Sequence, residues 1–301
     1  MVDPLAEVVT LLQPGTRHSK LVVGAGSWQV SRADTGQPFY CVVLDGACRL
    51  AVGGEAPAEL RAGDFILVPS ACGMAMSSLA LPSAGAPESL PIPLAPGEFR
   101  IGDPDAPADL RMLVGHCEFG SPDAALLVSL LPRVVLVRGE ARLATLVQLV
   151  RDEQHGSRPA REVILARLLE VLLIEALRST AGTAASPGLV RGLADARLAA
   201  ALRRMHEAPA YPWTVAQLAK EAALSRSAFF ERFRRAVGAA PMEYLLAWRM
   251  ALAKNLLRRN AGGVAEIAAL VGYGSASTFS TAFTRHVGLP PARYARETAE
   301  A

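Results

Sequence analysis

Cysteine and histidine are scarce in this sequence, with four cysteines and five histidines among 301 residues. The cysteines form no CxxC pair, and none has a histidine at zinc-finger spacing, which excludes the common zinc-stabilised modules. Cys41, Cys48 and Cys117 lie in apolar, strand-like surroundings. We therefore expect them to be small buried side chains rather than reactive thiols.

Targeting patterns and long apolar runs are also missing. The N-terminus, MVDPLAEVVTLL, carries acids and no basic segment, which argues against a signal peptide. The longest apolar stretches fall well short of the ~20 residues that a membrane-spanning helix needs. We expect a soluble cytoplasmic protein with no membrane contact.

Catalytic patterns are equally scarce. No Ser-His-Asp set, phosphate-binding loop or pair of catalytic carboxylates stands out. The neighbours His116 and Cys117 could suggest a nucleophile, but such a pair at a strand end is more often structural. We expect no enzymatic activity and no cofactor.

The charge is unevenly distributed along the chain. Residues 1–190 contain 15 Lys and Arg against 20 Asp and Glu, whereas residues 191–301 contain 16 against 8. A basic C-terminal third behind an acidic body indicates a polyanionic partner for that third, although a solvated basic face is the simpler alternative.

The N-terminal part has a strand-like pattern. Short apolar runs are separated by turn signals such as Asp45-Gly46 and Gly53-Gly54, which predicts a small β-sandwich or barrel. The expected strands are Leu21–Val23, Tyr40–Leu44, Arg49–Val52, Phe65–Val68 and Arg111–Val114. Residues 82–107 are rich in Pro, Gly and Ala and predict a long loop with one short strand at Phe99–Ile101.

Helical periodicity begins at Ala141. Two helices are expected, over Ala141–Gln154 and Ala160–Ser179, and the second is apolar over a wide arc. Either the barrel or a second copy of the chain could cover them. The small, polar segment Ser179–Gly188 is typical of a linker.

The C-terminal part contains an internal repeat. Val215, Leu218, Ala219, Ala223 and Leu224 recur 49 residues later, and Phe229, Phe233, Val237, Gly238 and Pro241 recur 50 residues later. Each unit predicts a short helix, a tight turn and a second helix, which is the helix-turn-helix motif. Gly272 suits the turn of the second unit, whereas Ala223 occupies that position in the first. Ser225 is the expected N-cap of the helix that follows.

One continuous helix is expected between the two units, from Pro241 to Asn260. A helix of about 20 residues spans roughly 30 Å. Successive major-groove openings on one face of B-DNA are roughly 34 Å apart, so double-stranded DNA is the expected partner.

The DNA-contacting residues follow from the direction of the phenylalanines. If Phe229 and Phe233 point into the core, the opposite face of their helix points outward, and the same holds for the second unit. The predicted contacts are Arg226, Ser227, Phe230, Glu231, Arg234, Ala276, Ser277, Thr278, Thr281 and Arg285. The remaining cations suit phosphate contacts or plain solvation: Arg235, Arg249, Lys254, Arg258 and Arg259.

The stretch from about Asp195 to Arg296 resembles the AraC/XylS family of bacterial transcription regulators. The motifs that carry the resemblance are WTVAQLA, LSRSAFFERFRRAVG, PMEYLLAWRM, VAEIAALVGYGSASTFSTAF and GLPPARY. The family implies two helix-turn-helix subdomains on a long helix, RNA polymerase as a further candidate partner, and either activation or repression, with an activator as our working assignment. Glu231 and Thr281 stand where relatives often carry basic residues, which predicts an altered sequence preference.

The N-terminal part resembles a cupin-type sensor domain through GDFILVP at Gly63–Pro69 and YCVVLDG at Tyr40–Gly46. Cys41 and Met74 stand where metal-binding cupins often have histidine, and the barrel region holds only His18 and His116, so we predict no metal. A barrel without a metal can still hold a small ligand, in its interior near Tyr40, Val42 and Met74, or can merely pack a core.

These observations predict a two-domain α+β chain. The expected parts are a cupin-like barrel at 1–140, a helical dimerisation element at 141–180, a linker at 181–194 and an all-α DNA-binding domain at 195–301. We expect a homodimer controlled by a small molecule, although the helices could instead pack on the barrel. A cupin enzyme with a helical appendage, or a DNA-binding protein whose barrel senses nothing, are the alternatives.

Overall fold

The computed structural model describes residues 2–32, 36–53, 57–71, 73–83, 87–121, 124–155, 159–179 and 187–299. Contacts divide the chain into two compact units. The barrel unit comprises residues 13–120 and 132–186, and the helical unit comprises residues 1–12, 121–131 and 187–301. The chain therefore passes between the two units four times. The predicted parts, 1–140, 141–180, 181–194 and 195–301, follow one another along the chain and do not include this interleaving.

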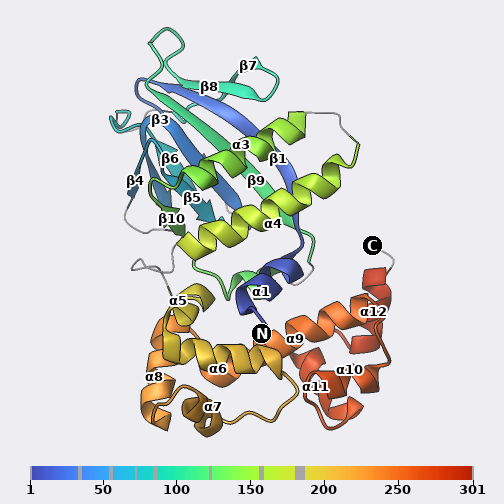
Figure 1. The fold of residues 1–301 in the computed structure, drawn as a ribbon. Helices are drawn as coiled ribbons and strands as arrows, with labels where there is room; N and C mark the ends of the chain where they lie inside the picture. The colour runs from blue at the N-terminus through green and yellow to red at the C-terminus, as the bar shows by residue number, and fades with distance from the viewer. Residues whose placement is uncertain are drawn as a thin grey trace. The chain divides into compact units, whose positions relative to one another are not determined.

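The barrel unit is built from ten strands and two helices in the part of the chain that is described. The strands are β1 (Pro14–Ala25), β2 (Gln29–Arg32), β3 (Phe39–Val52), β4 (Ala58–Arg61), β5 (Phe65–Val68), β6 (Met74–Ser77), β7 (Ile92–Ala95), β8 (Glu98–Gly102), β9 (Leu110–Phe119) and β10 (Val135–Val137). The helices α3 (Ala141–His155) and α4 (Arg161–Ser179) pack on each other and on β1 (Figure 1).

Strand β3 bends between the two sides of the barrel. Its first half pairs with β5 and β9, and its second half, from Ala47, pairs with β4 and β6. A bulge between Val43 and Asp45 and the positive φ of Gly46 (75°) produce the bend. The prediction that a turn at Asp45-Gly46 separates two strands, Tyr40–Leu44 and Arg49–Val52, is therefore wrong, since the glycine bends one continuous strand. A Cβ at Gly46 would lie 1.9 Å from the carbonyl oxygen of Asp109.

The other predicted strands are present, and residues 82–107 contain β7 in addition to the expected strand at β8. Strand β7 has the sequence IPLA and is exposed along its whole length. This sequence has no alternation of apolar and polar residues that would predict a strand. The barrel core gathers apolar side chains from every side, including Val22, Trp28, Phe39, Ile66 and Met112. Helices α3 and α4 begin and end close to the predicted positions.

The helical unit contains the repeat. Its helices are α1 (Pro4–Leu12), α2 (Ala124–Val128), α5 (Leu189–Ala194), α6 (Ala196–Glu207), α7 (Val215–Glu221), α8 (Arg226–Val237), α9 (Pro241–Arg258), α10 (Val264–Leu270), α11 (Ala276–Val287) and α12 (Pro291–Ala299). Helix α5 lies in the predicted linker, and residues 180–186 of that linker are outside the described residues.

Helices α1 and α2 belong to the helical unit although they are far from it in sequence. The buried side of α1, with Leu5, Val8 and Leu12, packs against α2 and α6, and α2 also contacts α9. The expectation that residues 1–140 form one barrel domain did not include this packing, because no local pattern shows which distant surface an apolar helix face will cover. No helix among the described residues has the length and apolar character needed to cross a bilayer.

Candidate nucleic-acid interface and barrel cavity

The two helix-turn-helix units have matching caps and cores. Ser225 and Ser275 cap α8 and α11 by accepting hydrogen bonds from the backbone N–H groups of Ala228 and Thr278. Gly238 and Gly288 end the same helices in the left-handed conformation, with φ of 88° and 85°. The predicted N-cap at Ser225 is therefore confirmed.

The aromatic cores of the two units are also equivalent. Phe229 and Phe233 are fully buried with ring centroids 5.5 Å apart, and Phe279 and Phe283 are buried at 5.4 Å. Each second phenylalanine meets a tyrosine edge-on, Tyr244 at 5.8 Å and Tyr294 at 5.6 Å. The inward direction of the phenylalanines is confirmed, and it turns the opposite faces of α8 and α11 outward.

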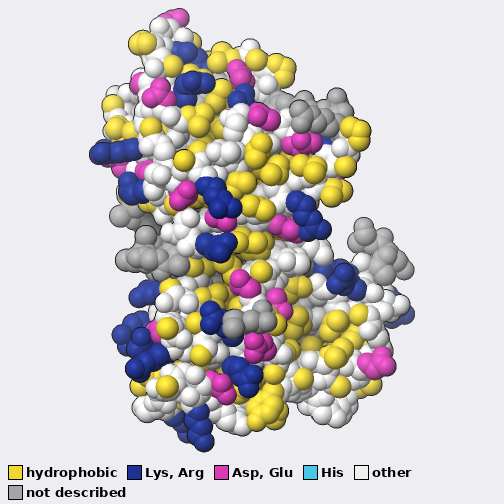
Figure 2. Space-filling model, viewed as in Figure 1, with side chains coloured by type: hydrophobic (Ala, Val, Ile, Leu, Met, Phe, Trp, Pro, Cys, Tyr) yellow, Lys and Arg dark blue, Asp and Glu magenta, His cyan; other side chains and the backbone are white. Residues whose placement is uncertain are grey.

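The predicted contact residues lie on these outward faces. Phe230 and Ala276 are partly exposed, and the remainder are exposed: Arg226, Ser227, Glu231, Arg234, Ser277, Thr278, Thr281 and Arg285. Figure 2 shows Lys and Arg side chains gathered at the lower left, in the region of α5 and α8. A groove there is lined by four arginines, Arg191, Arg197, Arg232 and Arg235, and by one acid, Asp195.

Asp195 joins the start of α6 to α8. Its carboxylate accepts hydrogen bonds from the backbone of Arg197 and Leu198 and forms an ion pair with Arg232. Burial acts to raise the pKa of Asp195, but the hydrogen bonds from Arg232 and the two backbone N–H groups outweigh it, so the pKa lies below 3.8. The ionised carboxylate thus fixes α8 against α6.

Arg249 has a structural role that the sequence did not reveal. Its guanidinium donates hydrogen bonds to the carbonyl oxygens of Pro209 at 2.7 Å and Tyr211 at 2.8 Å. The interpretation of Arg249 as a phosphate contact or a solvated charge is therefore replaced by a clamp between α9 and the segment before α7. Lys254 lies over the ring of Tyr294, 5.6 Å from its centroid.

A buried polar chain connects α1, α6 and α9. His206 stacks on Trp248 at 4.1 Å, and its Nδ1 lies 2.7 Å from a Glu7 carboxylate oxygen while its Nε2 lies 2.7 Å from the Tyr244 hydroxyl. Burial lowers the pKa of His206, although the hydrogen bond and charge of Glu7 oppose that effect. The neutral ring then donates a hydrogen bond from Nδ1 to Glu7, and its Nε2 accepts a hydrogen bond from the Tyr244 hydroxyl.

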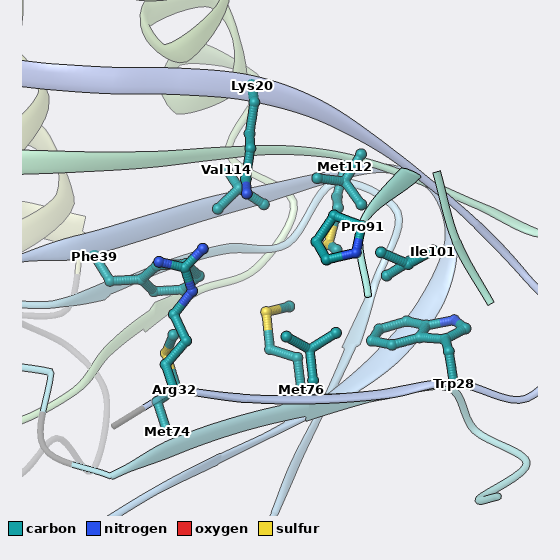
Figure 3. A pocket seen from close by; sticks show the side chains of 12 residues that line it. Lys20, Trp28, Arg32, Phe39, Met74, Met76, Pro91, Ile101, Met112 and Val114 are labelled. Atoms are coloured by element: carbon teal, nitrogen blue, oxygen red, sulfur yellow. The ribbon is translucent and has the colours of Figure 1, made fainter. Parts of the chain in front are cut away.

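The barrel unit encloses a cavity with about 490 Å³ of empty space, part of it open to solvent. Trp28, Phe39, Met74, Met76 and Met112 are among its apolar lining, and Lys20 and Arg32 are its two charged residues (Figure 3). Met74 was part of the predicted ligand region. Tyr40 and Val42 do not line this cavity, because they alternate along β3 with Phe39, Cys41 and Val43, which point into the barrel core.

Lys20 and Arg32 are not among the site residues that the sequence predicts. Both lie two residues from apolar cavity residues on the same strand, Val22 and Val30, and so share their face. The sequence shows which side chains share a face of each strand, but it does not show which face points into the barrel. Cys41, Cys48 and Cys117 are buried as expected, and burial raises the pKa of Cys48 and of Cys117 to about 12.

The cavity lining does not fit the metal site that many cupins carry. Its side chains carry thioethers and two cationic groups instead of the imidazoles and carboxylates that ligate such metals. The described residues also contain no group of three or more His, Cys, Asp or Glu that could hold a metal ion. Cys72 and the side chain of His18 lie outside what is described.

The fold and the two exposed recognition faces define a DNA-binding protein with an N-terminal barrel, and comparisons with known proteins agree. A family model described as a cupin matches residues 3–182, and one described as a helix-turn-helix domain matches residues 218–297. A Streptomyces lividans protein assigned as an AraC-like transcription regulator is 35% identical over 97% of this chain and 98% of its own length. A Streptomyces antibioticus protein assigned in the same way is 36% identical over 97% and 98%.

Among solved structures, the DNA-binding domain of the transcriptional factor AdpA, in complex with a target DNA, is 31% identical over 33% of this chain and 89% of that domain, with a TM-score of 0.32. The chain belongs to the AraC-like transcription regulators and carries a cupin domain at its N-terminus. It is a DNA-binding transcription regulator, which confirms the family resemblance seen in the sequence.

Proposed function

We propose that this regulator recognises specific operators by inserting α8 and α11 into successive major grooves of one DNA face. The observation that carries the proposal is the pair of equivalent units, each with a polar, exposed recognition face, joined by one helix of 18 residues. At 1.5 Å per residue, α9 is about 27 Å long, which is comparable with one turn of duplex DNA at roughly 34 Å.

The exposed faces supply groups suited to reading bases. Arg226, at the start of α8, has the geometry for bidentate hydrogen bonds to guanine, and Phe230 offers an apolar contact for a thymine methyl group. Ser277, Thr278 and Thr281 on α11 suit bases or phosphates. The arginine groove beside α8 supports phosphate contacts that position the helix.

The test starts from operators found by genome-wide mapping of binding sites. In gel-shift titrations, Arg226→Ala is expected to lower the affinity about tenfold or more and to relax the preference at one base pair, as loss of a bidentate contact predicts. Arg61→Ala, which removes an exposed arginine on β4 in the barrel unit, is the matched control. Equal binding by both variants at every operator position would contradict the proposal.

Glu231 gives a second test of the same interface. It is exposed on the recognition face of α8, where a carboxylate repels phosphate. Glu231→Arg is expected to raise the affinity, change the preferred operator and steepen the salt dependence. Unchanged affinity and preference in gel shifts at several salt concentrations would remove Glu231 from the interface.

We further propose that α4 pairs two copies of the chain. Ile164 and Val171 are 45% and 39% exposed, and Leu168 lies between them on the same outward stripe. Such a spacing of three and four residues is typical of helices that pair in solution. Val171→Lys is expected to give a monomer in sedimentation experiments, whereas Arg167→Lys should not. A dimer that survives Val171→Lys together with Ile164→Lys would place the contact elsewhere.

Effector control is the remaining part of the proposal. A small molecule in the barrel would favour one of two conformations of the regulator and so change its affinity for the operator. The cavity in the barrel unit supports this role. As an activator, the regulator would also contact RNA polymerase. It would act on DNA in the cytoplasm. Operator affinity that no barrel ligand alters would contradict effector control.

A further inference from the structure

The two charged residues of the barrel cavity come from opposite walls. Lys20 lies on β1 and is paired in register with Val114 of β9. Arg32 lies on β2 and is paired in register with Met74 of β6. Figure 3 shows the Lys20 side chain descending from one wall and the Arg32 side chain rising from the other, so that both cationic ends enter the space between them.

These positions face the inside of the barrel, where a charge is costly without a partner. Lys20 and Arg32 are half-buried, and no acidic residue is among the cavity lining that the structure describes. Glu98, whose strand pairs with β1 close to Lys20, is engaged by Arg151 at 2.9 Å. Desolvation and the charge of Arg32 both lower the pKa of Lys20, in keeping with the lack of an acidic side chain in the described lining.

The rest of the cavity has the opposite character. Trp28, Phe39 and Ile101 provide flat or branched apolar surface, and Met74, Met76 and Met112 add flexible thioethers that adapt to aromatic and alkyl shapes. The empty space of about 490 Å³ includes space that is open to solvent, so a ligand can enter the cavity from outside. The Lys20 ammonium also lies 5.1 Å from the Phe99 ring centroid, which keeps it near the cavity.

We infer that the barrel binds a small apolar carboxylate, with the carboxylate between Lys20 and Arg32 and the apolar body against Trp28 and the methionines. The two cations neutralise the ligand's charge, and the ligand relieves their mutual repulsion. A neutral ligand of the same shape leaves both cations uncompensated, and a cationic one adds a third like charge. Binding of the carboxylate does not involve DNA and is independent of the proposed function. Only the effect of the bound carboxylate on operator affinity rests on the proposed effector role.

The experiment compares three ligands with one body and different heads: 4-phenylbutyrate, 4-phenylbutan-1-ol and 4-phenylbutylamine. Titration calorimetry with the full chain is expected to show binding of the acid, at least tenfold weaker binding of the alcohol and no binding of the amine. Phenylacetate and 1-naphthoate extend the acid series to a shorter and a wider body. Absence of binding by all three acids overturns the inference, as does an alcohol that binds as tightly as its acid.

Variants assign the site. Lys20→Met and Arg32→Met are each expected to weaken the acid at least tenfold and to leave the alcohol unchanged, whereas Arg111→Met, on the exposed face of β9, changes neither. Lys20→Met is also expected to raise the melting temperature of the ligand-free protein by a few degrees, since it removes a desolvated charge. Unaltered binding of the acid in both variants, or a lowered melting temperature in Lys20→Met, overturns the assignment.

The proposed function is tested separately in the same preparations. If the acids fail to bind while operator DNA still binds, only the carboxylate inference fails. If operator binding fails to depend on the recognition faces, the proposed DNA contacts fail regardless of the calorimetry.

Discussion

The turns of the two helix-turn-helix units differ at a single residue type. Ala223 adopts φ of 50° in the first unit, and Gly272 adopts φ of 84° in the second. The left-handed conformation costs an L-residue roughly 1–2 kcal/mol, so the first unit holds a strained alanine where the second has glycine. The first turn is thus made without glycine.

Opposite substitutions at these turns should have opposite effects. Ala223→Gly is expected to raise the free energy of unfolding by about 0.5–1 kcal/mol, after the greater flexibility of glycine in the unfolded chain is included. Gly272→Ala should lower it by more than about 1 kcal/mol, because its Cβ would lie 2.8 Å from the carbonyl oxygen of Ala210. Urea unfolding measures both, and changes of equal sign would contradict the explanation.

His206 should make the stability of the helical unit depend on pH. Burial lowers the pKa of His206 in the folded state below its ordinary 6.5. The unfolded chain therefore takes up the proton first, so stability is complete above pH 6.5 and falls as the pH decreases towards the folded pKa. In melting experiments from pH 8 to pH 5, His206→Gln should show a smaller decrease than the wild type. An identical decrease would assign the dependence to other groups.

At the scale of elements, the helices of the DNA-binding part were predictable and the strand connections were not. Caps, glycines and phenylalanines act within one turn of helix, so Ser225, Gly238 and Phe233 carry their structural meaning in the local sequence. The bend of β3 at Gly46 depends on the distant Asp109, and the choice of Lys20 as an inward residue depends on which face of β1 meets the other sheet. Neither relation exists in the sequence around the residue itself.

Helix α9 should depend on Arg249 for its attachment to the segment before α7. Arg249→Met removes two hydrogen bonds from a charged donor to carbonyl oxygens and is expected to lower the free energy of unfolding by about 2 kcal/mol. Arg259→Met, at the exposed end of the same helix, should change it by less than about 0.5 kcal/mol. Chemical denaturation of both variants tests the difference, and equal effects would contradict the clamp.

At the scale of the whole molecule, the helical unit, which contains the DNA-binding repeat, is assembled from three separate segments of the chain. Residues 1–12 and 121–131 join residues 187–301, and Glu7 of the first segment contacts His206 of the last. The sequence predicts a DNA-binding domain at 195–301 alone, because the repeat and the family motifs lie there.

A fragment of residues 187–301 should therefore melt at a lower temperature than the same residues do in the full chain. It lacks α1 and α2, whose apolar faces cover α6 and α9. A peptide of residues 2–12 added to the fragment is expected to raise the melting temperature, and the same peptide with Leu5→Asp should not. A fragment that is fully stable and indifferent to the peptide would show that α1 contributes nothing to this unit.

The interleaved order of the segments also constrains how this architecture can change during evolution. A single crossover between two related genes, placed just before the α5 coding region, would unite the recognition helices of one parent with the α1 and α2 of the other. Such a hybrid inherits mismatched surfaces at Leu5, Val8 and His206 unless both parents agree there. New operator specificities are thus more readily acquired by substitutions on α8 and α11 than by exchange of the entire C-terminal part.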